Sequence, residues 1–148
     1  MKKLIIKILL SWLVLLALPA LTHAQEIKKL IIIGNNTAIK ETDAKTIRNI
    51  FRGKEQMWAN REQVTIVLPS SKSDFADAVA SEIFQMTVTG MQRYWLSLVF
   101  QGRANSPVFL NTAKEMITWV KENPGSICAI PAEYINEIPT GLLIRIKE

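Results

Sequence analysis

Four short runs of β-branched and other apolar residues constrain the fold of this chain more than any other feature. The first run, IKKLIII, ends at Gly34, and the second, VTIVL, is followed directly by Pro69. The other two, SICAI and LLIRI, lie near the carboxyl end of the chain. Runs of this length and composition are typical of strands buried in a sheet. We therefore predict strands over residues 27–33, 64–68, 126–130 and 142–146.

Segments with apolar residues at helical spacing lie between these strands. In the first, Ile47, Ile50 and Phe51 recur on one helix face, and Gly53 ends the segment. Three more helical segments separate the second and third strands, and residues 131–136 can add a turn of helix. The order strand, helix, strand, three helices, strand, strand predicts an α/β fold with a single small sheet flanked by helices. The expected N-caps are Thr42 or Asp43, Ser73 or Asp74, Thr89, and Asn111 or Thr112.

The first 24 residues have the pattern of a secretory signal peptide. Lys2 and Lys3 precede an apolar run of about 15 residues, shorter than the ~20 that span a bilayer. Ala24 offers a small residue for cleavage. An uncleaved membrane anchor is the alternative. We expect cleavage after about Ala24, a single mature domain over residues 25–148, and a periplasmic location. Without the leader's three lysines, fifteen basic residues stand against thirteen acidic ones, a net charge of +2.

The expected mature domain lacks the residues on which many catalytic and metal sites depend. Its sequence has no histidine, because His23 lies in the leader, so His-based metal sites and His-based general bases are excluded. A nucleophilic pair of Ser71 and Lys72 would need a desolvated lysine, and its neighbourhood is polar. No basic run or stripe of arginine and aromatic residues indicates nucleic-acid binding. We therefore expect no enzyme, no metal, no cofactor and no nucleic-acid partner.

Cys128 and the tryptophans each leave two interpretations. Cys128 is the only cysteine and cannot form an internal disulfide, so it is either a small buried residue in a strand or a reactive thiol. Trp58 lies in a polar connection, where it either packs over the edge of the core or contacts a partner. Trp95 and Trp119 lie on the apolar stripes of helices, which favours core packing over ligand stacking.

The segment PSSKSDF, residues 69–75, is the best candidate for a binding site. It follows a predicted strand and precedes a predicted helix, whose first N–H groups and partial positive charge can hold an oxyanion. The hydroxyls of Ser70, Ser71 and Ser73 could donate hydrogen bonds, and Lys72 could add positive charge. The alternative is an ordinary N-cap with exposed polar neighbours.

Four segments of the chain, taken in order, resemble phosphate-type substrate-binding proteins of ABC importers. TIRNIFRGKEQMW is similar to the family's "dIflGK…W" segment, and ENPGSICAIPAEY is similar to its "PGAIGYV" segment. Between them, VTIVLPSSKSDF lies where the family has a strand and its "SGT…F" phosphate loop. YWLSLVFQGR resembles the "YW…F.G" helix of short members. The resemblance covers most of residues 27–134.

The resemblance implies a type II periplasmic-binding-protein-like α/β fold the size of one lobe, the lobe that carries the phosphate loop. It aligns Ser71 and Ser73 with the serine and threonine that donate to phosphate in the family. The chain also departs from the family pattern. Lys72 stands at a glycine position, and Leu68 and Pro69 stand where the family has an arginine and an aspartate. Because arginine is the bidentate partner of phosphate, its loss there should weaken binding.

We expect a periplasmic, non-enzymatic binding protein that donates hydrogen bonds to phosphate or a related oxyanion for an ABC importer. The candidate ligand-binding residues are Ser70, Ser71 and Ser73, with Asn36 and Thr37 of the first loop beside them. The membrane subunits of the importer would be its partners. The alternative hypothesis is a domain that has kept the fold and lost the ligand. Such a domain would serve as an interaction or accessory module for a periplasmic sensor protein or a membrane complex.

Overall fold

The computed structural model describes residue 27 and residues 29–147. The expected signal peptide, residues 1–24, and its cleavage position therefore lie outside the described residues. Within the described part of the chain, none of the helices has the length and the hydropathy that crossing a bilayer requires.

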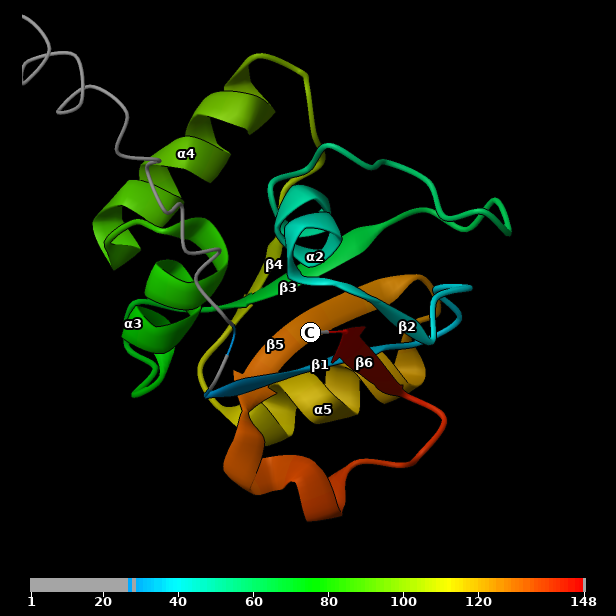
Figure 1. Ribbon diagram of the computed structural model, residues 1–148. Helices are drawn as coiled ribbons and strands as arrows, with labels where there is room; N and C mark the ends of the chain where they lie inside the picture. The colour runs from blue at the N-terminus through cyan, green and yellow to red at the C-terminus, as the bar shows by residue number, and fades with distance from the viewer. Residues whose placement is uncertain (1–26, 28, 148) are drawn as a thin grey trace, which may run out of the picture.

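A mixed sheet of six strands forms the centre of the fold (Figure 1). The strands are β1 (Leu30–Gly34), β2 (Glu41–Asp43), β3 (Thr65–Pro69), β4 (Val108–Leu110), β5 (Ser126–Pro131) and β6 (Leu143–Lys147). Their order in the sheet is β2-β6-β1-β5-β3-β4. β1 pairs antiparallel with β5 and β6, whereas β3 runs parallel to both β5 and β4, and β2 runs parallel to β6. The predicted α/β class is confirmed.

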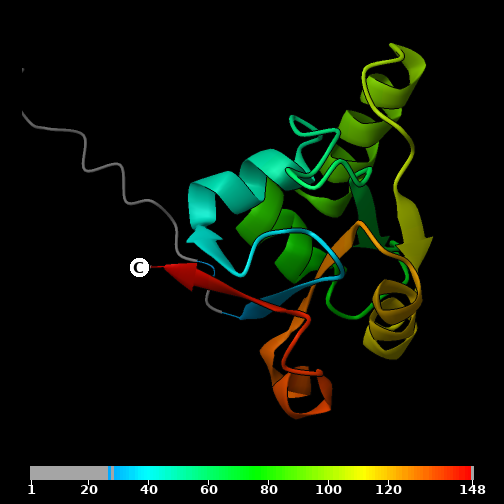
Figure 2. The same cartoon turned by 90° about the vertical axis from the view of Figure 1, so that its right-hand side faces the viewer.

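Helices cover both faces of this sheet (Figures 1 and 2). On one face, α5 (Ala113–Glu122) packs against β1, β3, β4 and β5. On the other face lies α2 (Ala44–Phe51), which contacts the π-helical segment η1 (Ala80–Phe84). The short helix α3 (Ala76–Val79) leads into η1, and α4 (Val88–Phe100) packs on η1. The turn of helix expected after β5 is the 3-10 helix η2 (Ala132–Glu137).

Two of the four predicted helix caps are confirmed and two are wrong. Asp43 caps α2 by accepting from the Thr46 N–H at 2.8 Å, and Thr112 forms a capping box with α5. Neither Ser73 nor Asp74 caps a helix, because residues 70–75 form turns and helical structure begins only at Ala76, with no side-chain cap. The cap of α4 is Thr87 and not Thr89. Both residue types favour that position, and the local sequence does not distinguish them.

The two shortest strands, β2 and β4, were not predicted. Each has three residues, too few for a two-residue alternation to be recognised. They exist because longer strands offer them a pairing edge: β2 pairs with β6, and β4 pairs with β3. β4 forms one edge of the sheet and carries Phe109, whose side chain is 41% exposed.

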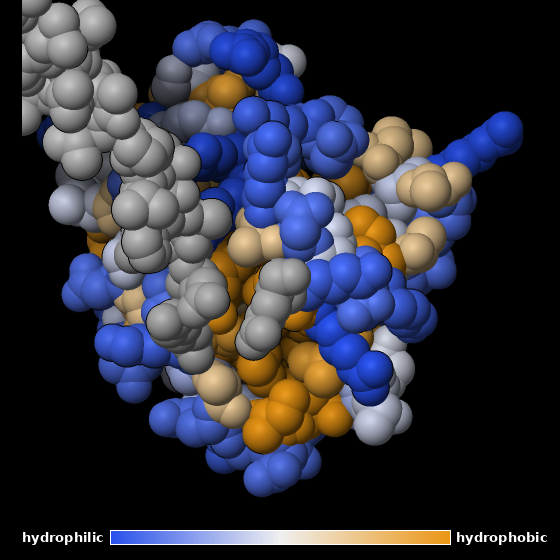
Figure 3. All heavy atoms as spheres, in the orientation of Figure 1, coloured by the Kyte–Doolittle hydropathy of each residue, from blue (hydrophilic) through white to orange (hydrophobic). Residues whose placement is uncertain are grey.

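A continuous hydrophobic core joins the sheet to both helical layers. Cys128 is fully buried in β5, and burial raises the pKa of its thiol far above the ordinary value, so the interpretation as a buried core residue is confirmed. Trp95 is buried and Trp119 half-buried, as the helical stripes predicted. On the face seen in Figure 3, further hydrophobic residues gather over β1 and β6, with polar residues around them.

Two of the segments that carry the family resemblance meet in the structure. Trp58 is 5% exposed, and its Nε1–H donates to the carbonyl oxygen of Gly125 at 2.8 Å. Trp58 therefore packs at the edge of the core, which was one of its two interpretations. This hydrogen bond between the GKEQMW and ENPGS segments fixes the connection after α2 to the turn before β5.

Candidate functional site

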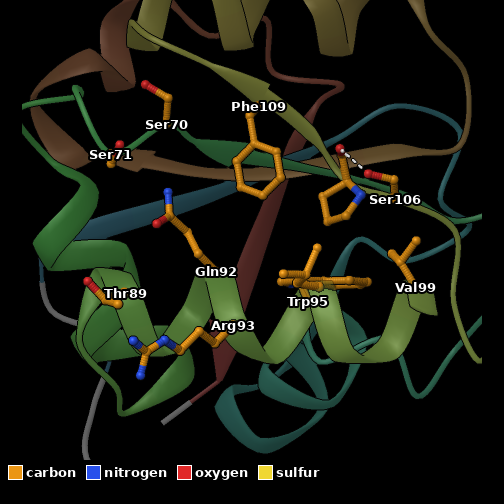
Figure 4. A pocket seen from close by; sticks show the side chains of 11 residues that line it. Ser70, Ser71, Thr89, Gln92, Arg93, Trp95, Val99, Ser106 and Phe109 are labelled. Atoms are coloured by element: carbon orange, nitrogen blue, oxygen red, sulfur yellow. Dashed lines mark hydrogen bonds between the residues drawn. The ribbon is translucent and has the colours of Figure 1, made fainter. Parts of the chain in front are cut away.

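A cavity of about 540 Å³ lies between α4, the loop at the carboxyl end of β3, and the edge strand β4 with the two residues before it (Figure 4). Sites outside the carboxyl ends of parallel strands are a common place for ligands in α/β folds, because loops rather than covering helices meet there. Its wall consists of Ser70, Ser71, Thr89, Gln92, Arg93, Trp95, Leu96, Val99, Ser106, Pro107 and Phe109.

The serines after β3 differ in how free they are to bind. The N–H of Ser70 donates to the carbonyl oxygen of Leu110 at 2.8 Å, and its hydroxyl donates to Oδ1 of Asn111 at 2.6 Å. The same hydroxyl accepts from the Lys72 N–H at 3.2 Å. Ser71 is exposed, and neither its N–H nor its hydroxyl is bonded to another described residue. Ser71 is therefore the serine with unused donors facing the cavity, and Ser70 fixes the loop to β4.

The first turns of α4 add three polar side chains that the sequence interpretation missed. Thr89, Gln92 and Arg93 line the cavity, and Figure 4 shows Gln92 extending from α4 toward Ser71. Arg93 is exposed and has no hydrogen bond or ion pair with the described residues. Positions 89, 92 and 93 have the spacing of one helix face, which was the available signal. The sequence could not show that this face turns toward Ser71.

Ser73 lies away from the cavity wall. Its side chain is 8% exposed, and its Oγ is enclosed without a hydrogen-bond partner among the described residues. The Ser73 N–H donates to the Ser70 carbonyl oxygen at 3.1 Å, which closes the turn after β3. The structure thus gives Ser73 a part in the loop's backbone geometry, and it does not bring the hydroxyl to the cavity.

Replacing Ser73 with alanine tests this position directly. An enclosed hydroxyl without a partner costs stability, so we expect Ser73→Ala to leave the free energy of unfolding unchanged or to raise it by up to about 1 kcal/mol. The matched control is Ser126→Ala, which removes a fully buried hydroxyl that does donate, to the Asn123 carbonyl oxygen at 2.5 Å. That variant should lose about 1 kcal/mol in the same urea denaturation. A Ser73→Ala variant less stable than Ser126→Ala would contradict the assignment.

Asn36 and Thr37 lie at the opposite end of the sheet, so the expectation that they neighbour the serine loop is wrong. They follow β1, whose last residue, Gly34, pairs with Ile127 near the amino end of β3. Asn36 binds Asn60 and Glu62 through its side chain, and Thr37 is buried. The antiparallel course of β1 beside β5 carries its loop to the edge where β3 begins, and the serines follow the edge where β3 ends.

The residues in the family's arginine and aspartate positions are part of the core. Leu68 is fully buried and Pro69 is buried within β3, where Pro69 pairs with Leu110. The exposed side chain of Lys72, at the family's glycine position, has no partner among the described residues. Positive charge at this cavity therefore comes from Arg93 on α4, and not from the strand end.

The other half of the cavity wall is apolar. Trp95 forms its base with 2% exposure, and Pro107 is buried beside it. Figure 4 shows the Phe109 ring pointing from β4 toward α4, with Val99 beyond Trp95 along the helix. The described residues contain no cluster of histidine, cysteine, aspartate or glutamate suited to a metal ion. The arrangement therefore offers hydrogen-bond donors and one cation at one end and an aromatic surface at the other.

The fold is similar to part of the solved phosphate-type substrate-binding proteins. No protein-family model and no curated protein matches the sequence. Among solved structures, PstS from Borrelia burgdorferi aligns with a TM-score of 0.57 over 81% of this chain at 16% identity. A phosphate ABC transporter substrate-binding protein from Clostridium perfringens, solved with bound phosphate, aligns with a TM-score of 0.56 over 79% at 15% identity.

An ABC-type phosphate transport receptor from Vibrio cholerae aligns with a TM-score of 0.50 over 80% of this chain, at 15% identity. The alignments cover 47%, 44% and 46% of the Borrelia, Clostridium and Vibrio proteins, so the chain spans less than half of each. The predicted periplasmic-binding-protein-like fold is thus confirmed for a chain about the size of one lobe.

Proposed function

We propose that this chain is an exported solute-binding protein that holds an oxyanion, phosphate or a related one, in the cavity between α4, the carboxyl end of β3 and the edge strand β4. The observation that carries the proposal is that Ser71, Gln92 and Arg93 line one cavity, with the donors of Ser71 and Arg93 unused by the described residues. The hydroxyl and N–H of Ser71 and the guanidinium of Arg93 would donate to the anion. Arginine to oxyanion bonds are charge-assisted and strong.

Binding of this kind needs no covalent chemistry, so the protein would act as a receptor and not as an enzyme. The solved proteins of similar fold are described as phosphate transport receptors and substrate-binding proteins, which supports the same role here. In the periplasm, its partners would be the membrane subunits of an ABC importer. Because the aligned part of this chain spans less than half of each of those proteins, one wall of the cavity would be open to solvent or to a partner.

Calorimetric titration of the purified chain with inorganic phosphate and with sulfate at low salt tests the proposal. We expect saturable heat at millimolar anion or below, and we expect Arg93→Gln to weaken binding about tenfold or more, as loss of a bond to a charged group does. The matched control is Arg145→Gln, which makes the same charge change at an exposed position of β6, on the other side of β1 from β3. No heat from the folded chain would overturn the proposal, as would equal losses in both variants.

A second function is favoured by the apolar residues that α4 exposes. Leu96 is 57% exposed and Phe100 is 82% exposed, on a helix whose buried face already packs on η1. Large exposed apolar side chains next to each other are typical of protein contacts. A domain without ligand that docks through α4 on a periplasmic sensor or a membrane complex would use them. The same titration separates the two functions, because a ligand-free module gives no heat with either anion.

A further inference from the structure

We propose that the ligand of the cavity is an amphipathic oxyanion, such as an organophosphonate or a phosphate monoester with an aromatic or aliphatic group, and not the bare inorganic ion. This inference rests on the proposed function and narrows its ligand class. The reason lies in how the two ends of the cavity differ.

The cavity is much larger than a bare oxyanion needs. Its volume of about 540 Å³ falls in the range of roughly 300–1,000 Å³ that is typical of sites for organic ligands. Orthophosphate has no apolar surface, so it would fill only the end at Ser71 and Arg93. The remaining space along Trp95 and Phe109 would then hold water against aromatic surface, and that end would add nothing to the affinity.

The apolar end of the cavity exposes hydrophobic side chains that a bound ligand would bury, which would favour binding. Phe109 is 41% exposed and Val99 is 36% exposed, and both face the space above the buried Trp95 (Figure 4). Burial of apolar area is worth about 25 cal/mol per Å², and aromatic pairs add to this. A charged group placed there would lose hydration without a partner, which is unfavourable. The apolar end therefore selects the uncharged part of a ligand.

The polar end sets the orientation of such a ligand. Arg93 and Gln92 lie on α4 one turn before Leu96. Gln92 extends toward Ser71 in the loop after β3, and Arg93 extends past Thr89 at the same end of the helix (Figure 4). Donors at this end would hold the anionic group, so the organic group would extend toward Phe109 and Val99. One ligand could thus use both halves of the wall at once.

Calorimetric titration of the full chain with four probes tests the inference. Methylphosphonate and phenylphosphonate have the same anionic group and differ in apolar area, while inorganic phosphate lacks the organic group and benzyl alcohol lacks the charge. We expect phenylphosphonate to bind at least about tenfold more tightly than methylphosphonate or phosphate, because it buries an aromatic ring. Benzyl alcohol should bind more weakly than phenylphosphonate by a similar factor, because it leaves Arg93 unused.

Two variants with the same substitution connect the preference to the cavity. Phe109→Ala should remove most of the preference for the phenyl group, because it should weaken phenylphosphonate binding more than methylphosphonate binding. Phe100→Ala removes a phenylalanine of α4 that is 82% exposed and outside the cavity, and it should change neither affinity. Thermal unfolding would confirm that both variants are folded, as expected for exposed side chains.

The outcomes separate this inference from the proposed function. Equal affinities for phosphate, methylphosphonate and phenylphosphonate would overturn the amphipathic ligand and leave the oxyanion site intact. Heat with none of the three anions would overturn both proposals. Benzyl alcohol binding as tightly as phenylphosphonate would show that the anionic group contributes nothing, which also overturns both. An unchanged phenyl preference in Phe109→Ala would overturn the location argued for the organic group.

Discussion

Replacing Arg48 with methionine is expected to lower the free energy of unfolding by about 3–5 kcal/mol, because it leaves a buried carboxylate without its cation. Arg48 and Glu82 are each 8% exposed. The Nε of Arg48 donates to the Glu82 carbonyl oxygen at 3.1 Å and thereby joins α2 to η1. Burial and the nearby Arg52 lower the pKa of Arg48, and the electrostatic attraction of Glu82 opposes this shift. Urea denaturation followed by circular dichroism measures the loss.

Two controls give this prediction its specificity. Arg48→Lys keeps the charge and gives up the Nε bond, so its loss should be smaller than that of Arg48→Met. Arg145→Met removes an exposed arginine from β6 and should stay within about 0.5 kcal/mol of the parent chain. If Arg48→Met is no less stable than Arg145→Met, the Arg48 side chain does not hold α2 against η1.

Replacing Gly125 with alanine is expected to cost about 2–5 kcal/mol. Gly125 has a φ of +82°, and left-handed backbone costs an L-residue about 1–2 kcal/mol. A Cβ added there would also overlap with the carbonyl oxygen of Gln63, and displacing packed backbone adds roughly 1–3 kcal/mol. The displacement would disturb three bonds of this turn: Gly125 N–H to the Asn35 carbonyl, and Trp58 Nε1–H and the Thr65 N–H to the Gly125 carbonyl.

Gly102→Ala is the matched control for the steric part of this loss. Gly102 has a φ of +64°, and nothing lies within 4 Å of the position of an added Cβ. That variant carries the backbone strain alone and should lose about 1–2 kcal/mol. The tryptophan emission of Gly125→Ala should shift as Trp58 becomes exposed, whereas that of Gly102→Ala should not. Equal losses in the two variants would mean that the contact with Gln63 contributes nothing.

Four residues in the segments that carry the family resemblance stabilise the fold and do not line the cavity. Arg48, Arg52, Trp58 and Gly125 belong to the matching segments, and in the structure all four make bonds that join elements. Arg48 and Arg52 donate to carbonyl oxygens of η1, and Trp58 donates to Gly125. Conversely, Leu68 and Pro69, at the charged positions of the family's site, are buried in β3. The chain can therefore keep this fold whatever its ligand is.

The longer elements could be predicted because their physical causes are local. Dense β-branched runs predicted β1, β3, β5 and β6, and helical spacing with a cap predicted α2 and α5. The short strands β2 and β4 could not be predicted, since pairing with a distant strand stabilises them. The start of the helix after β3 was placed too early for a similar reason. The serines there resemble caps, but the turn held by Ser70 and Asn111 delays the helix until Ala76.

For the candidate site, the amino-acid sequence by itself determined that the segment after β3 carries three serine hydroxyls. It could not decide which serines face a cavity: Ser71 lines it, whereas Ser73 is enclosed, although the two are separated by a single residue. Nor could it exclude Asn36 and Thr37, because which loops share an edge of the sheet depends on strand order and direction. The tertiary structure placed Ser71, Arg93 and Phe109 in the wall of one cavity, since only the packing of α4 beside the end of β3 and the edge strand β4 brings these distant segments together.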